Sequence, residues 1–142
     1  MNIFITGGAG FIGSNLTAFL LEKGHTIKSL DNLSTGTEEH IAPFLAHPDF
    51  EFIKGDVTIK EEVEPLMQWC DHCYHLAAPV GVKYIMEHPV HTILGNVRGI
   101  DNMLALTEAY KKRILIASTS EIYGKNLDFL DPTHKAKLKE DS

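Results

Sequence analysis

The chain has 142 residues, 44% of them hydrophobic, and a formal net charge of −6. Its length fits one ordinary domain with a real core, and its acidity argues against nucleic acid or an anionic membrane as a partner. The sequence shows neither an apolar run near the roughly 18 residues that cross a bilayer nor the pattern of a signal peptide. Two cysteines do not suggest a disulfide scaffold, so a cytoplasmic, reducing compartment is expected.

Apolar strands and amphipathic helices alternate along the chain. Five short segments predict strands, at residues 2–6, 26–31, 50–53, 73–76 and 113–117, the first of them an apolar run that ends at glycines. Four segments between them predict helices, at residues 11–23, 37–45, 58–69 and 90–110. Thr58, followed by Glu61, has the spacing of a capping box at the start of the third helix. The alternation predicts an α/β fold, a Rossmann-type doubly wound parallel sheet of about five strands with helices on both faces.

The alternating pattern ends near residue 124. Beyond it the sequence is charged and loop-like, so we assign residues 1–124 to one folded domain and residues 125–142 to a loop or tail. A parallel sheet that stops after its fifth strand would expose an edge and an uncovered apolar face. We therefore expect partial instability or self-association.

Two cysteines and two histidines lie close together, at residues 70, 72, 73 and 75. A structural zinc site needs a complete tetrahedral set of ligands, and neighbouring residues of a strand point to opposite faces. The C-x-x-C pair also does not open a helix, as a redox pair would. We expect neither a metal site nor a redox site here.

The segment FITGGAGFIG, residues 4–13, contains two overlapping glycine patterns. Gly8, Gly10 and Gly13 form G-x-G-x-x-G, while Gly7, Gly10 and Gly13 form G-x-x-G-x-x-G. A glycine-rich turn between a strand and a helix lets backbone N–H groups approach a diphosphate, and the helix N-terminus adds partial positive charge. The pattern predicts a dinucleotide loop and leaves its register open.

Asp31 supports the dinucleotide interpretation. It ends the second predicted strand, 18 residues after Gly13. A carboxylate at this place can accept hydrogen bonds from the adenosine ribose hydroxyls and would repel a 2′-phosphate, which favours NAD over NADP. The alternative is a solvated aspartate in a turn.

Six short motifs follow one another in an order typical of one enzyme family. They are TGGAGFIGSNL, LDNLSTG, GDV, HLAAPVGV, NVRG and ASTSEIYG. Together they resemble the extended short-chain dehydrogenase/reductases, in the NAD-dependent epimerase/dehydratase family that acts on nucleotide sugars. The resemblance covers residues 1–124, with one small departure, since Ile100 stands where the family usually has threonine.

The resemblance implies a set of cofactor-binding residues. It selects the pattern G-x-x-G-x-x-G, which begins at Gly7. It also places Asp56 and Val57 beside the adenine, and it makes Asn96 a helix residue that supports the site. The full set for NAD is Gly7, Gly10, Phe11, Ile12, Gly13, Asp31, Asn32, Asp56, Val57, Leu76, Ala77, Ala78, Asn96 and Ser118.

The resemblance also implies two catalytic residues after the fifth strand. Thr119 matches the family hydroxyl that would hydrogen-bond the sugar hydroxyl or ketone near the nicotinamide. The next two residues, Ser120 and Glu121, resemble the form that this motif takes in UDP-glucuronate decarboxylases and some epimerases. In a decarboxylase-like interpretation, Glu121 would take part in catalysis. The alternative for Glu121 is a loop carboxylate that caps a backbone N–H.

The family's general base is absent from this sequence. That base is the tyrosine of Y-x-x-x-K, whose lysine lowers the tyrosine pKa, and none of the four tyrosines has lysine four positions later. We expect the N-terminal, cofactor-binding part of an enzyme that performs transient hydride transfer at sugar C4, inactive alone, with a nucleotide-sugar substrate and a possible homodimer. The alternative is a non-catalytic NAD-binding regulatory or interaction module.

Overall fold

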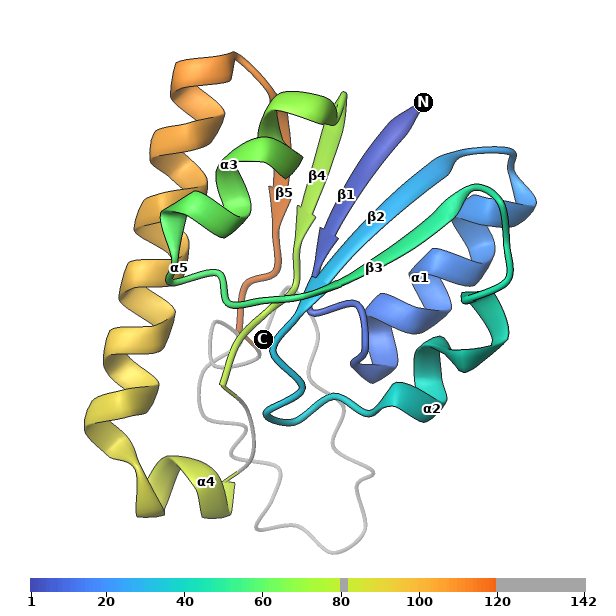
Figure 1. Cartoon of the computed structure of the whole chain (residues 1–142). Helices are drawn as coiled ribbons and strands as arrows, with labels where there is room; N and C mark the ends of the chain where they lie inside the picture. The colour runs from blue at the N-terminus through green and yellow to red at the C-terminus, as the bar shows by residue number, and fades with distance from the viewer. Residues whose placement is uncertain (80–81, 120–142) are drawn as a thin grey trace, which may run out of the picture.

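The computed structural model describes residues 1–79 and 82–119. Its centre is a five-stranded sheet with the strand order β3-β2-β1-β4-β5, in which every neighbouring pair is parallel (Figure 1). The strands are β1 (Asn2–Thr6), β2 (Thr26–Asp31), β3 (Phe50–Lys54), β4 (His72–His75) and β5 (Arg113–Ile116). The predicted fold class, a Rossmann-type parallel sheet, is confirmed.

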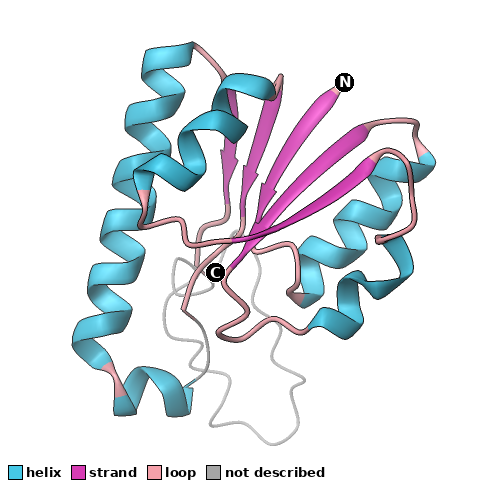
Figure 2. Ribbon diagram, viewed as in Figure 1, coloured by secondary structure: helices cyan, strands magenta, loops and turns pink. Residues whose placement is uncertain are grey.

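Helices cover both faces of the sheet. They are α1 (Phe11–Glu22), α2 (Glu38–Ile41), the 3-10 turn η1 (Ala42–Phe44), α3 (Lys60–Trp69), α4 (Val82–Glu87) and α5 (Pro89–Tyr110). The pair α3 and α5 lies on one side of the sheet, and α1 and α2 lie on the other (Figure 2). Within the described ranges, no helix combines the length and the apolar character needed to cross a bilayer.

The sheet separates two apolar clusters. Against α3 and α5 the buried core consists of Phe4, Leu30, Val63, Leu66, Met67, Cys70, Cys73, Met103 and Leu106. Against α1 and α2 it consists of Ile3, Ile5, Ala9, Leu20, Leu21, Ile27, Ile41 and Phe50. Successive strand residues supply opposite clusters, because side chains alternate along a strand. Burial on both faces explains why β1, at the centre of the sheet, is a nearly continuous apolar run in the sequence.

Two predicted helices differ from the structure. Helix α3 begins at Lys60 with Ile59 as its N-cap, because the N–H and the hydroxyl of Thr58 both donate to Asp56 Oδ1 at 2.8 Å. The helix expected at 37–45 is divided into α2 and η1, with a proline in the first turn of η1. Helix α4 was not predicted at all. Strand β4 begins one residue earlier than expected, and the proposed tail, 125–142, lies outside the described residues.

The strand order fixes where a ligand can enter. From β1 the chain builds the sheet first toward β2 and β3, and later toward β4 and β5 on the other side. The connections after β1 and β4 therefore diverge and leave a crevice at the carboxyl ends of these two strands. The glycine loop follows β1 at this place, and Leu76 to Pro79 follow β4.

Candidate functional site

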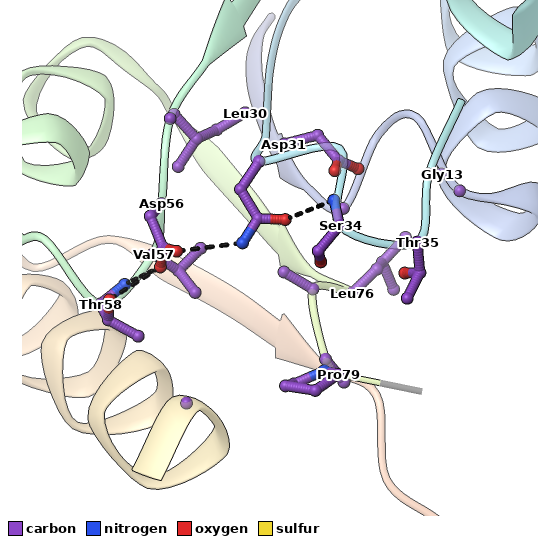
Figure 3. Close-up of a pocket in the computed structure, with 18 of the residues that line it drawn as sticks. Gly13, Leu30, Asp31, Ser34, Thr35, Asp56, Val57, Thr58, Leu76 and Pro79 are labelled. Atoms are coloured by element: carbon purple, nitrogen blue, oxygen red, sulfur yellow. Dashed lines mark hydrogen bonds between the residues drawn. The ribbon is translucent and has the colours of Figure 1, made fainter. Parts of the chain in front are cut away.

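A cavity of about 390 Å³ occupies the crevice at the carboxyl ends of the strands (Figure 3). It is bounded by the glycine loop, by the segments that follow β2, β3 and β4, and by α5. Twelve of the residues expected at the cofactor site line it: Gly7, Gly10, Phe11, Ile12, Gly13, Asp31, Asn32, Asp56, Val57, Leu76, Ala77 and Ala78. Segments that are far apart in the sequence are thus brought together as expected.

The glycine loop has the register of Gly7, Gly10 and Gly13. Gly7 has a left-handed φ of +74°, and a Cβ there would lie 2.8 Å from the backbone nitrogen of Ala77. A Cβ on Gly13 would overlap the carbonyl oxygen of Gly7. Gly8 is buried against Ser29 and does not line the cavity. Gly7 therefore makes the turn, and Gly8 serves the packing of the loop on the sheet.

The N-terminus of α1 opens at the cavity without a side-chain cap. Its N-cap is Gly10, no side chain caps the N–H groups of the first turn, and the first turn holds no acidic residue. The first helical N–H to find an intrahelical acceptor is that of Ser14, which donates to the Gly10 carbonyl at 3.0 Å. The preceding N–H groups and the helix dipole make this end a binding place for an anion.

Asp31 fixes the glycine loop from the end of β2. Its Oδ2 accepts a hydrogen bond from the N–H of Ala9 at 2.9 Å, and its Oδ1 accepts one from the N–H of Leu33 at 2.8 Å. The carbonyl of Ala9 accepts from the N–H of Thr37 at 3.1 Å and from the imidazole of His40 at 2.8 Å. Since each carboxylate oxygen has two lone pairs, Asp31 keeps acceptor capacity for a ligand.

A polar network joins the segments after β2 and β3. The Asn32 amide donates to Asp56 Oδ2 at 3.0 Å, and its oxygen accepts from the N–H of Ser34 at 3.0 Å (Figure 3). Burial raises the pKa of Asp56, but the hydrogen bonds from Thr58 and Asn32 and the charge of His91 outweigh it, so the pKa lies below its ordinary value. Asp56 is an anionic acceptor at the cavity wall.

Helix α5 closes the cavity on the side of α3. A Cβ on Gly99 would lie 2.9 Å from Val57 Cγ2, and one on Gly95 would lie 3.2 Å from Pro79 Cγ. The Asn102 amide also donates to the Val57 carbonyl at 3.0 Å. This close packing brings His91 and Arg98 to the cavity. The sequence interpretation missed both residues.

The segment after β4 is anchored to the end of β1. Thr6 Oγ1 lies 2.7 Å from His75 Nδ1 and accepts hydrogen bonds from the N–H groups of Leu76 and Ala77, each at 3.2 Å. Thr6 and His75 are both buried. Burial holds the pKa of His75 below its ordinary value.

Three of the expected site residues that the structure describes do not line the cavity. Asn96 is an exposed residue of α5, one position beyond Gly95, and the helical turn carries it away from the lining. Ser118 and Thr119 are exposed and follow Ala117, which does line the cavity. Glu121 lies outside the described residues.

The two cysteines are buried thiols. Both lie in the core. Burial raises the pKa of Cys70 to about 11 and that of Cys73 well above its ordinary value, so both remain protonated at neutral pH. No group of three or more candidate metal ligands occurs among the residues that the structure describes.

Comparison with known proteins relates the chain to enzymes of nucleotide sugars. The family model described as GDP-mannose 4,6 dehydratase matches residues 4–137. UDP-glucuronic acid decarboxylase 1 from Danio rerio is 43% identical over 122 residues, which are 86% of this chain and 28% of the relative. UDP-glucuronic acid decarboxylase 3 from Arabidopsis thaliana is 45% identical over 125 residues, which are 87% of this chain and 35% of the relative. The chain thus spans about a third of the length of these relatives.

Solved structures of nucleotide-sugar enzymes have a similar fold over most of this chain. A dTDP-glucose 4,6-dehydratase from Streptomyces venezuelae, with NAD bound, matches 89% of this chain and 42% of its own, with a TM-score of 0.82 and 28% identity. A UDP-glucose 4-epimerase from Thermus thermophilus in complex with NAD matches 96% of this chain and 42% of its own, with a TM-score of 0.77 and 33% identity.

Proposed function

Because the chain belongs to the GDP-mannose 4,6-dehydratase family, within the extended short-chain dehydrogenase/reductases, we propose that it binds NAD as the cofactor-binding part of a nucleotide-sugar enzyme. One observation carries the proposal. The glycine cradle of Gly7, Gly10 and Gly13, the uncapped N-terminus of α1 and the carboxylate of Asp31 all meet at one cavity. This set fits a dinucleotide, since it offers N–H groups to a diphosphate and a carboxylate to a ribose.

Each part of the cavity would hold a different part of the cofactor. The glycine loop and the first turn of α1 would hold the diphosphate, because both line the cavity and the N–H groups of this turn have no side-chain cap. Asp31 would accept the ribose hydroxyls with its remaining lone pairs and would exclude a 2′-phosphate by charge repulsion. Asp56 would accept a hydrogen bond from the exocyclic amine of the adenine.

The chemistry we propose is transient oxidation of the sugar at carbon 4. When bound, NAD supplies the acceptor for the hydride. Thr119, just after β5, would hold the oxygen at carbon 4 by a hydrogen bond from its hydroxyl. None of the four tyrosines is followed by lysine at the fourth position, so we propose that this chain alone binds cofactor and does not turn over substrate.

Within the family, we favour the decarboxylases that act on UDP-glucuronate. The support is the identity of 43–45% to UDP-glucuronic acid decarboxylases of animals and plants, together with the sequence Thr119-Ser120-Glu121. In this interpretation the enzyme would oxidise carbon 4 so that the carboxylate at carbon 5 lies beta to a ketone and leaves as CO₂.

Calorimetric titration of this chain with NAD and, separately, NADP tests the proposal. We expect saturable binding of NAD and weaker binding of NADP. The variant G24A is a suitable control, because Gly24 follows the far end of α1 and lies outside the cavity lining. Absence of binding at millimolar NAD, in a chain shown to be folded, would overturn the proposal.

We also propose that the chain associates with a second copy through α5. The helix exposes apolar side chains at alternating spacings of three and four residues, which are Val90, Ile93, Val97, Ile100 and Leu104. Their exposed fractions range from 39% to 67%. This spacing forms a seam on which a copy of the same helix can pack, and α5 lies at the edge of the described fold (Figure 1).

A further inference from the structure

The hydroxyl of Thr6 is surrounded by three nitrogen atoms. His75 Nδ1 lies 2.7 Å away, and the backbone nitrogens of Leu76 and Ala77 each lie 3.2 Å away. Thr6 is 0% exposed and His75 is 5% exposed, so water does not compete for these bonds. The whole arrangement must therefore be satisfied by the protein's own donors and acceptors.

The hydrogen bonds around the Thr6 hydroxyl determine the protonation state and the tautomer of His75. A hydroxyl oxygen has two lone pairs and one proton. The N–H of Ala77 donates to this oxygen, and the N–H of Leu76 is shared between it and the Thr6 carbonyl, each at 3.2 Å. Among the described residues, the acceptor within reach of the hydroxyl proton is His75 Nδ1. A proton on Nδ1 would place a third donor on the same oxygen and leave the hydroxyl proton without an acceptor. His75 is accordingly neutral, with its proton on Nε2.

The peptide held by Thr6 is also the contact between the two walls of the cavity. A Cβ on Gly7 would lie 2.8 Å from Ala77 N, 2.9 Å from Ala77 Cα and 2.9 Å from the carbonyl carbon of Leu76. The turn of the glycine loop is thus pressed against the peptide that joins Leu76 and Ala77. A movement of this peptide would therefore change its contact with Gly7. Gly7, Leu76 and Ala77 all line the cavity, so the shape of the cavity would change as well.

We propose that His75 is a positioning residue of the dinucleotide site. As the Nε2–H tautomer it accepts the hydroxyl proton of Thr6, which orients the lone pairs of Thr6 toward the Leu76–Ala77 peptide and sets that peptide against Gly7. The effect on NAD affinity rests on the proposed function. The tautomer and the ordering of the peptide do not, and they can be measured without any ligand.

The first experiment uses the ligand-free chain. Nitrogen-15 NMR of the imidazoles, with the His75 signals identified by their loss in H75N, should show an unprotonated Nδ1 and a protonated Nε2. The amide proton of Ala77 should exchange slowly with solvent in the parent and in T6S, and fast in T6V and H75L. The amide proton of Leu76 should stay slower, because it also donates to the Thr6 carbonyl. H72N is the matched control, because His72 lies three residues earlier on the same strand and outside this network.

The second experiment measures NAD affinity by calorimetry in the same variants. T6V leaves the N–H of Ala77 and Nδ1 without their partner, while the N–H of Leu76 keeps the backbone carbonyl of residue 6, so we expect affinity to fall by about tenfold or more. T6S keeps the hydroxyl, and H75N keeps an acceptor near the position of Nδ1, so both should remain within about threefold of the parent. H72N should bind like the parent.

Three outcomes would overturn the proposal. The first is a proton on Nδ1 of His75, and the second is fast exchange of the Ala77 amide in the parent. The third is a variant T6V that is less stable yet binds NAD like the parent when folded, since the pair would then serve folding alone. If the parent itself binds no NAD, the proposed function fails, and the imidazole and exchange data still decide the role of His75 in ordering the peptide.

Discussion

Asp31 and Ala9 are joined by a hydrogen bond of 2.9 Å between a carboxylate oxygen and a backbone N–H. The residue expected to bind the ribose therefore also holds the glycine loop in place. Asp31 is 9% exposed, and its other oxygen is bonded to the N–H of Leu33. Ligand recognition and loop geometry are coupled in this one side chain.

Replacing Asp31 by alanine should have two effects. NAD binding should weaken and the preference over NADP should narrow, because the ribose acceptor and the charge are both lost. The free energy of unfolding should also fall by about 1–3 kcal/mol, since Ala9 loses the acceptor of a buried N–H. Calorimetry and urea unfolding measure the two effects. D31N is the control that keeps one acceptor. Unchanged affinity for both cofactors would remove Asp31 from the site.

Replacing Gly13 by alanine should strongly weaken NAD binding. The added Cβ would overlap the Gly7 carbonyl oxygen and lie 2.7 Å from Gly8 Cα, so the loop must shift. We expect affinity to fall by more than about tenfold and stability to fall by about 1–3 kcal/mol. Calorimetry checks the first and urea unfolding the second.

Gly24 supplies the matched control for the glycine loop. It has a φ of +76° and no neighbour within 4 Å of an added Cβ, at the far end of α1. G24A should lower stability by roughly 1–2 kcal/mol through backbone strain alone and leave NAD affinity unchanged. Equal loss of affinity in G24A and G13A would mean that general instability, not loop geometry, controls binding.

Local sequence predicted the strands, the glycine loop and Asp31 because each depends on neighbours in the chain. The predicted helix cap at Thr58 was wrong for a local reason. Asp56, two residues earlier, accepts hydrogen bonds from both the N–H and the hydroxyl of Thr58, so this hydroxyl does not cap the helix. The contribution of α5 was not predictable. Arg98 reaches the cavity only because Gly99 packs on Val57, a contact that no local pattern encodes. Helix α4 is too short for a periodic signal.

Replacing Ser29 by alanine should leave stability unchanged or raise it by up to about 1 kcal/mol. The Ser29 hydroxyl is buried beneath Gly8 and is without a hydrogen-bond partner among the described residues. S29V should instead be destabilised, because its larger side chain would displace Gly8 and with it the glycine loop. Urea unfolding of both variants measures this. A clear loss of stability in S29A would show that the hydroxyl has a partner, such as water.

Stability should decrease as the pH falls from about 7.5 to about 5.5. Burial lowers the pKa of His75 in the folded chain below its ordinary value of 6.5. Below that value the unfolded chain takes up a proton that the folded chain does not, so unfolding becomes more favourable as the pH falls. Asp56 does not contribute in this window, because its pKa is lowered. Urea unfolding as a function of pH should show a smaller slope for H75N than for the parent.

Replacing Val97 by glutamate should prevent association of the chain. Val97 is 59% exposed in the middle of the apolar seam on α5, so a charge there would be buried in the contact between two copies. Leu45 is also 59% exposed but lies after η1, away from α5. Sedimentation should therefore show a concentration-dependent dimer for the parent and for L45E, and a monomer for V97E. A monomeric parent, or equal dissociation of both variants, would contradict pairing through this seam.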